Sequence, residues 1–245
     1  MLGNKTAFIT GSSRGIGKAI ARAFAIEGYN VVINCKNSRS ELEATEKELL
    51  EITPDILAIQ GDVSKYETAE LVFRKIYNQF GGVDILVNNA GISYIGLFNT
   101  MRESQWQRVM KCNLDTVFNC THIAIQSMIK NHKGNIINIS SMWGNMGASC
   151  EAVYSASKGA VNAFTKAMAK ELAPSGIRVN AISCGAIDTQ MNSCLSREER
   201  RTLEEEIPLG RFGTADEIAS MAMYLAGEES RYITGQIIGV DGGMC

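Results

Sequence analysis

The sequence has few of the residues from which metal sites and histidine-based catalysis are built. Among 245 residues there are two histidines, His122 and His132, and the seven cysteines include no C-x-x-C pair. A zinc site or a Ser/His/Asp triad therefore has little to draw on, and we expect no metal. Cysteines without a disulfide pattern are typical of a reduced chain, so we expect a cytoplasmic protein.

Long apolar runs and an excess of basic charge are also absent. No stretch reaches the roughly 18 apolar residues of a membrane-spanning helix. The first residues show no basic segment followed by a long apolar one. The formal net charge is −2, and the most charged stretch, SREERRTLEEEIP, mixes both signs. We therefore expect neither a membrane nor nucleic acid as a partner.

What the sequence does contain is an alternation of short apolar runs with longer stretches of helical periodicity. This is the pattern of β-α units, and near-continuous apolar runs suit parallel strands covered on both faces. We predict one α/β domain over 1–245, with a Rossmann-type doubly wound fold and a seven-stranded parallel sheet. Strands are expected at 5–10, 30–35, 56–61, 84–89, 135–140, 177–183 and 235–241. Helices are expected at 15–28, 39–52, 65–80, 103–130, 152–173 and 215–226.

One irregular stretch, 185–213, lies between two expected strands and carries a charged helix. Insertions at the carboxyl ends of strands in such sheets are where ligands are held. We interpret this stretch as a substrate lid, and a plain surface connection is the alternative.

A glycine-rich segment, TGSSRGIGKAI, follows the first expected strand directly and leads into a helix. Gly11, Gly15 and Gly17 allow the backbone to turn sharply and to approach a pyrophosphate. The helix offers unpaired N–H groups and a partial positive charge to that anion. The spacing is G-x-x-x-G-x-G, and its place between a strand and a helix predicts a dinucleotide site.

The end of the second expected strand indicates which dinucleotide is bound. Sites that prefer NAD place a carboxylate there for the ribose 2′-hydroxyl, whereas this chain has Cys35 followed by Lys36. With Arg14 inside the glycine loop, two cations are available to a 2′-phosphate. We therefore predict NADP(H) as the cofactor; the alternative is that either cation faces solvent.

The segment AVYSASKGA, residues 152–160, places a tyrosine and a lysine on one face of an expected helix. Tyr154 and Lys158 are four residues apart, a separation that brings side chains together. They form either a surface pair or a phenol whose pKa the ammonium lowers for proton transfer. Ser141, at the end of an expected strand thirteen residues before the tyrosine, favours the catalytic interpretation.

Five motifs have an order and spacing that resemble the short-chain dehydrogenase/reductase family. They are TGSSRGIG, GDV at 61–63, NNAG at 88–91, ISS at 139–141 and YSASK at 154–158. The resemblance covers nearly the whole chain, and PLGRFG and ITGQIIGVDGG are most similar to the 3-oxoacyl-[acyl-carrier-protein] reductase branch. It implies an NADPH-dependent reductase of a ketone or 3-ketoacyl thioester, presented by a carrier protein, that forms a homotetramer.

The resemblance also implies roles for individual positions. The implied catalytic set is Asn113, Ser141, Tyr154 and Lys158, in which Tyr154 is the general acid and Asn113 holds a water of the proton relay. The residues implied to bind the cofactor are Gly11, Ser12, Ser13, Arg14, Gly15, Ile16, Gly17, Lys36, Asp62, Val63, Asn89, Ala90, Gly91, Tyr154, Lys158, Ile187 and Thr189.

Three positions depart from the family pattern. Cys184 stands where the family usually has proline, and it is either a redox-sensitive thiol or a small buried filler. His132 and Ser175 stand where carrier-protein reductases have arginines near the mouth of the site. Recognition of an acidic carrier is therefore left open.

Two further functions stay open. The stretch SSMWGNMGASCEAVYSASK, together with DTQMN, resembles a branch that reduces a 5-aminopentanone group on translation elongation factor P. Glu151 would then pair with the substrate amine, or else cap the helix that it precedes. The other alternative is a non-catalytic NADP-sensing regulator, which would be expected to lose the tyrosine or the lysine.

Overall fold

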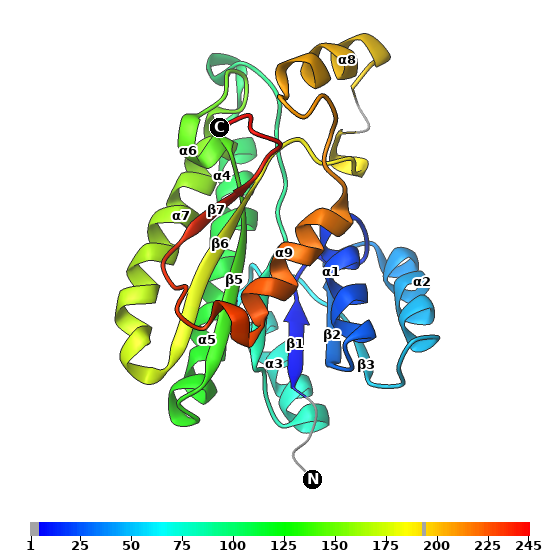
Figure 1. Cartoon of the computed structure of the whole chain (residues 1–245), viewed down its shortest axis with the longest axis vertical. Coiled ribbons are helices and arrows are strands. Elements are labelled where there is room, and N and C mark those ends of the chain that lie inside the picture. The colour runs from blue at the N-terminus through cyan, green and yellow to red at the C-terminus, as the bar shows by residue number, and fades with distance from the viewer. Residues whose placement is uncertain (1–4, 193–194) are drawn as a thin grey trace.

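The computed structural model describes residues 5–192 and 195–245. At its centre is a seven-stranded sheet whose neighbouring strands all pair in parallel, in the order β3-β2-β1-β4-β5-β6-β7 (Figure 1). The predicted fold class is confirmed, and each strand lies within two residues of its expected bounds. The strands are β1 (Thr6–Ile9), β2 (Asn30–Cys35), β3 (Ile56–Gln60), β4 (Ile85–Asn88), β5 (Gly134–Ser141), β6 (Ile177–Cys184) and β7 (Ile237–Val240).

Helices cover both faces of the sheet because successive strand residues point to opposite sides and both sides are apolar. Along β1, Ala7 and Ile9 belong to one core and Phe8 to the other. Helices that pack on the first core are α1 (Gly15–Ile26), α2 (Arg39–Leu50) and α9 (Ala215–Ala226). Helices that pack on the second are α3 (Tyr66–Phe80), α5 (Thr116–Lys130) and α7 (Ala152–Leu172). The domain therefore has three layers (Figure 1).

The strand order reverses between β1 and β4, and such a reversal marks the crevice where doubly wound sheets bind ligands. All strands are parallel, so the segments that follow β1, β2, β4, β5 and β6 all leave the sheet on the side where the carboxyl ends of the strands lie, called here the carboxyl edge. α8 (Arg197–Glu206) lies beyond this same edge, at the top of Figure 1.

The helix expected over 103–130 is interrupted. It consists of α4 (Glu103–Met110), a π-helical turn over Lys111–Asp115, and α5. Turns of this kind are frequent at functional sites, and this one contains Asn113, which is buried. A further helical turn, α6 (Trp143–Met146), follows β5 directly and is absent from the predicted elements.

The stretch 185–213 is closed at its base. Ile187 and Gly213 form a β-bridge, and Ala186, Ile207 and Phe212 make a small separate core. Both ends of the stretch are therefore held together at the ligand-binding edge of the sheet.

The described residues contain neither a membrane-spanning helix nor a cluster of metal ligands. No helix in this part of the chain is long and apolar enough to cross a membrane. The same residues contain no group of three or more His, Cys, Asp or Glu side chains placed to hold a metal ion.

Candidate active site

The glycine loop lies so close to the segment after β4 that side chains are excluded from it. A Cβ at Gly11, where φ is +63°, would lie 2.8 Å from the Cα of Ala90. A Cβ at Gly17 would lie 2.6 Å from the carbonyl oxygen of Gly11. Asn89 Nδ2 donates to the carbonyl oxygens of Thr10 and Gly11, both at 2.9 Å. Glycine is therefore required where these two segments meet.

A cleft of about 970 Å³ opens beside this contact. Such a volume is typical of pockets that take a cofactor-sized ligand. The predicted cofactor residues that line it are Gly11, Ser13, Arg14, Gly15, Ile16, Gly17, Lys36, Asp62, Asn89, Ala90, Gly91 and Thr189. The structure thus brings together most of the predicted set from five separate segments of the chain.

Five predicted cofactor residues are not among those that line the cleft. Ser12, Val63 and Ile187 are buried, and Tyr154 and Lys158 lie on α7. Ser12 holds the loop to β2: its N–H donates to the carbonyl oxygen of Asn34 and its hydroxyl accepts from the Asn34 N–H, both at 2.9 Å. Its place in the motif is explained by loop geometry.

The cleft fits a dinucleotide on the chemistry of its residues. α1 begins at Gly15, and the preceding residue, Arg14, makes no side-chain cap bond to it. The N–H groups of the first turn are therefore left for an anion, which the helix dipole also favours. The close-packed glycines allow the backbone to approach a pyrophosphate at that point.

The two cations predicted to bind a 2′-phosphate each pair with a carboxylate. Arg14 Nη1 lies 3.0 Å from both oxygens of Glu41, and Lys36 Nζ lies 2.8 Å from Asp62 Oδ2. Burial raises the pKa of Asp62, but hydrogen bonds from Lys36 and Ser64 outweigh it and hold that pKa below its ordinary value. Arg14, Lys36 and Asp62 line the cleft, and Glu41 lies on α2.

The catalytic candidates lie at the ends of β5 and α7. Ser141 is the last residue of β5 and is buried, and Tyr154 and Lys158 occupy successive turns of α7. Lys158 Nζ donates to the carbonyl oxygen of Ile139 at 2.7 Å and lies 5.7 Å from the centre of the Tyr154 ring. The Ser141 hydroxyl is near enough to the Tyr154 phenol to lower the pKa of that phenol. The structure brings these three side chains together.

The pKa of Tyr154 moves in the direction opposite to the one expected from a neighbouring ammonium. Burial raises it well above its usual range, and this outweighs the lowering by the Ser141 hydroxyl. Burial also lowers the pKa of Lys158 to about 8. In the free protein, desolvation therefore governs both groups.

The Asn113 side chain is held by three hydrogen bonds to two residues. Its Oδ1 accepts from the Ile92 N–H at 2.8 Å, and its Nδ2 donates to the Ile92 carbonyl oxygen and to the Ser157 hydroxyl, both at 2.9 Å. A Cβ at Gly91 would lie 3.3 Å from Asn113 Oδ1 and 3.6 Å from Lys158 Nζ. The segment after β4 thus touches Asn113, Lys158 and the cleft at once.

One wall of the cleft carries no motif that predicts it. It is formed by Ser104, Gln107 and Arg108 of α4 and by Lys111 and Cys112 of the π-helical turn. The positions 104, 107, 108 and 111 lie on one helical face. That polar stripe is the signal from which the wall could have been inferred.

A contact between the start of α7 and the segment after β4 is also invisible in the sequence. Ser93 Oγ donates to Glu151 Oε2 at 2.5 Å, and the Gly96 N–H donates to the Cys150 carbonyl oxygen at 2.8 Å. Glu151 makes no side-chain cap bond to α7, so capping is not its role. Its negative charge adds to burial in raising the pKa of Tyr154.

The three departures from the family pattern now have locations. Burial raises the pKa of the Cys184 thiol to about 12, and the side chain belongs to a hydrophobic core, so it is a small filler. His132 and Ser175 precede β5 and β6, with the His132 carbonyl oxygen beside Gly176. They therefore lie where the amino ends of the strands are, on the side of the sheet opposite the cleft. Within one chain they are not at the mouth of the cleft.

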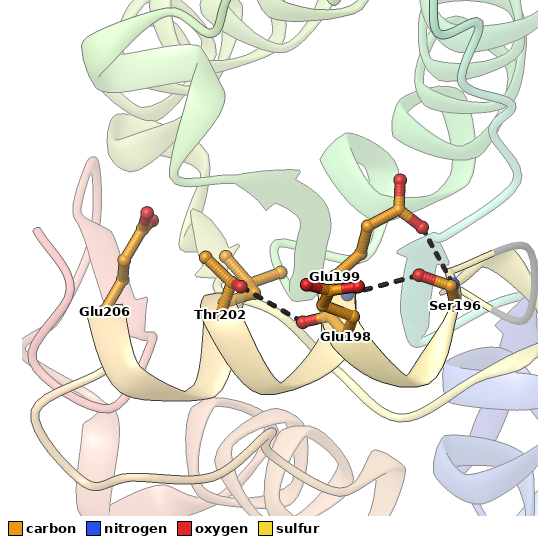
Figure 2. A pocket seen from close by; sticks show the side chains of 6 residues that line it. Ser196, Glu198, Glu199, Thr202 and Glu206 are labelled. Carbon is orange, nitrogen blue, oxygen red and sulfur yellow. Dashed lines mark hydrogen bonds between the residues drawn. The ribbon is translucent and has the colours of Figure 1, made fainter.

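A second hollow, of about 700 Å³, lies along α8 (Figure 2). The Glu199 carboxylate accepts from the Ser196 N–H at 2.8 Å, and the Ser196 hydroxyl accepts from the Glu199 N–H at 3.2 Å, which is a capping box. The Thr202 hydroxyl donates to the Glu198 carbonyl oxygen. These groups start and hold the helix.

The chain is similar to known oxidoreductases over nearly its whole length. A family model described as enoyl-(acyl carrier protein) reductase matches residues 11–245. The 3-oxoacyl-[acyl-carrier-protein] reductase of Staphylococcus epidermidis is 42% identical over 241 residues, covering 98% of this chain and 99% of that protein. An uncharacterized oxidoreductase of Bacillus subtilis is 39% identical over 243 residues, covering 98% of each. The solved structure of a short-chain type dehydrogenase/reductase from Mycobacterium marinum is 36% identical, with a TM-score of 0.94 over 99% of this chain and 96% of that one. The chain belongs to the short-chain dehydrogenase/reductase family and is an oxidoreductase.

Proposed function

We propose that this oxidoreductase is an NADPH-dependent reductase of 3-oxoacyl thioesters on acyl carrier protein, acting in the cytoplasm. The observation that carries the proposal is the cluster of Ser141, Tyr154 and Lys158 beside a cleft that fits a dinucleotide. Similarity over nearly the whole chain to a 3-oxoacyl-[acyl-carrier-protein] reductase supports the substrate class.

Each catalytic residue has a separate task in this scheme. NADPH, when bound in the cleft, supplies the hydride that reduces the ketone carbon. Tyr154 acts as the general acid and protonates the ketone oxygen. The Ser141 hydroxyl donates a hydrogen bond to the same oxygen and stabilises the negative charge that develops there. The influence of Ser141 on the pKa of Tyr154 supports placing both hydroxyls near one substrate oxygen.

A raised pKa of Tyr154 suits reduction, because a general acid must hold its proton until the ketone arrives. Once that proton has left, the phenolate is stabilised by the Lys158 ammonium, 5.7 Å from the ring centre. The pKa of about 8 leaves Lys158 largely protonated at neutral pH and able to pass a proton back. Both amide hydrogens of Asn113 are engaged, so Asn113 holds the relay water through an oxygen atom.

The substrate is tested by following NADPH oxidation with acetoacetyl-[acyl-carrier-protein] and with acetoacetyl-coenzyme A. We expect turnover with both and a lower KM for the carrier-protein form. Failure to oxidise NADPH with any 3-oxoacyl thioester would contradict the substrate class. Failure over a broad panel of ketones would favour the NADP-sensing regulator instead, although the chain keeps the tyrosine and the lysine that such a regulator would be expected to lose.

One observation favours a second candidate, the reduction of a 5-aminopentanone group on a modified protein. The carboxylate of Glu151 is held by Ser93 beside Tyr154, where it suits a substrate amine. The same assay discriminates the candidates when a protein that bears the aminoketone is added. Faster turnover of the modified protein than of every acetoacetyl thioester would replace the first candidate by the second.

The preference for NADPH is tested by the double substitution of Arg14 and Lys36 by Ala. Hydrogen bonds to charged groups contribute roughly 1.5–3 kcal/mol each, so we expect NADPH affinity to fall at least about 100-fold. NADH affinity should change by no more than about threefold, because NADH has no 2′-phosphate. Titration calorimetry of both dinucleotides measures this, and equal losses would overturn the preference.

Two features of the assembled enzyme belong to the same proposal. The predicted lid, 185–213, acts on the substrate through its described residues, since Thr189, Gln190 and Met191 line the cleft; positions 193 and 194 lie outside the described residues. The enzyme is a homotetramer, as the family resemblance implies, with contacts through α4, α5 and α7. Light scattering of the purified protein measures its subunit number.

A further inference from the structure

Arg14, which lines the cleft where a 2′-phosphate would lie, forms an ion pair with Glu41 through one guanidinium nitrogen. Both carboxylate oxygens of Glu41 are 3.0 Å from Arg14 Nη1. The pair joins the glycine loop to the first turn of α2, across 27 residues of sequence. Arg14 lines the cleft, and its side chain is 56% exposed, so a ligand in the cleft has access to it.

We infer that Glu41 is a specificity residue that holds Arg14 until a 2′-phosphate displaces it. The inference rests on the NADP(H) preference proposed above and adds an internal competitor to it. In the free protein the carboxylate takes the place of the phosphate on the guanidinium. Binding of NADPH then exchanges one anion for another on Arg14.

The exchange follows from the charges of the two ligands. A guanidinium binds carboxylate and phosphate through the same N–H donors, so the two anions compete for Arg14. A phosphate monoester carries a charge of about −1.5 to −2 at neutral pH, against −1 for Glu41. The phosphate therefore binds the guanidinium more strongly and displaces the carboxylate. An uncharged 2′-hydroxyl does not, and Arg14 stays on Glu41 when NADH binds. Glu41 therefore reduces the affinity for NADPH and leaves that for NADH unchanged.

The neighbouring pair, Lys36 and Asp62, is built differently. Asp62 accepts from the N–H and hydroxyl of Ser64, at 3.2 and 2.6 Å, and its side chain is 19% exposed. Asp62 is thus fixed by its own loop, while the Lys36 side chain is 55% exposed and free to turn from it. Of the two carboxylates that pair with these cations, Glu41 is therefore the better one to substitute, because replacing Asp62 would also disturb its own loop.

The test is the substitution Glu41→Gln, which keeps the shape of the side chain and removes its charge. We use adenosine 2′,5′-bisphosphate and 5′-AMP as probes, because they differ only in the 2′-phosphate, together with NADPH and NADH. Titration calorimetry should show the bisphosphate and NADPH binding about fivefold more tightly, and 5′-AMP and NADH within about twofold of the wild type. The variant Arg14→Ala should bind the bisphosphate equally well with and without Glu41→Gln.

A matched control lies two residues further along α2. Glu43 pairs with Arg39 at 2.7 Å, and both side chains are more exposed than Glu41. Glu43→Gln removes the same charge from the same helix, and it should leave all four affinities within about 1.5-fold.

The role of Glu41 and the NADP(H) preference can fail independently in these experiments. Unchanged or weaker bisphosphate binding by Glu41→Gln would show that Glu41 positions Arg14 or does nothing, and it would overturn the inference. An equal gain with Glu43→Gln would reduce the effect to net charge and would also overturn it. If the wild type binds NADH as tightly as NADPH, the NADP(H) preference itself fails, whatever Glu41→Gln does.

Discussion

Replacing Tyr154 by phenylalanine is expected to lower kcat for ketone reduction by about 10³-fold, the middle of the range for a lost general acid. The substitution removes the hydroxyl that protonates the ketone oxygen, and the ring remains in place on α7. The dissociation constant of NADPH should stay within about threefold of wild type. Single-turnover NADPH oxidation measures the chemical step, and fluorescence titration measures binding.

Tyr66→Phe is the matched control for this substitution. Tyr66 is an exposed tyrosine at the start of α3, and its hydroxyl is hydrogen-bonded to His122 at 3.0 Å. The variant loses the same hydroxyl away from the cleft and should keep kcat within about twofold. If Tyr154→Phe also stayed within a few-fold of wild type, Tyr154 would not be the proton donor.

Replacing Lys158 by methionine is expected to reduce kcat/KM by at least about 10²-fold, because the phenolate of Tyr154 then loses its cationic neighbour. The substitution keeps the length of the side chain and removes its charge. It also removes the hydrogen bond to Ile139. Steady-state kinetics with a 3-oxoacyl thioester measures the loss.

The same variant should reveal the buried ammonium through the pH dependence of stability. Burial lowers the pKa of Lys158 from 10.5 to about 8, so between these values the unfolded chain binds more protons than the folded one. The stability of the wild type must then rise with pH in this window as the folded lysine loses its charge. Relative to Lys158→Met, the wild type should gain about 2 kcal/mol of unfolding free energy between about pH 7.5 and 9.5.

Denaturant unfolding of both proteins at the two pH values gives this difference. Lys170→Met serves as the control, since Lys170 is exposed in the last turn of the same helix. Its difference from wild type gives the baseline for removing an exposed lysine from α7. A difference between wild type and Lys158→Met that changes with pH no more than this baseline would show that Lys158 keeps an ordinary pKa in the folded protein.

Local patterns were sufficient to predict most of the architecture. Apolar runs such as NVVINC formed strands because both faces of a parallel sheet are covered, and strand bounds then follow from where the apolar run stops. The helix expected over 103–130 has these bounds, but it contains a π-helical turn at Lys111–Asp115 that was not predicted. Helical periodicity does not reveal such a turn, because Asn113 within it is held by hydrogen bonds to Ile92 and Ser157, which are distant in sequence.

The sequence by itself determined the doubly wound sheet, the glycine loop after β1 and the residue types able to move a proton, because periodicity and motif spacing express these locally. Only the tertiary structure decided what those residues meet. It paired Arg14 with Glu41 and Lys36 with Asp62, and it formed a cleft wall from α4. It also reversed the expected shift of the Tyr154 pKa. Burial and long-range contacts set these properties, and both arise only when distant segments pack together.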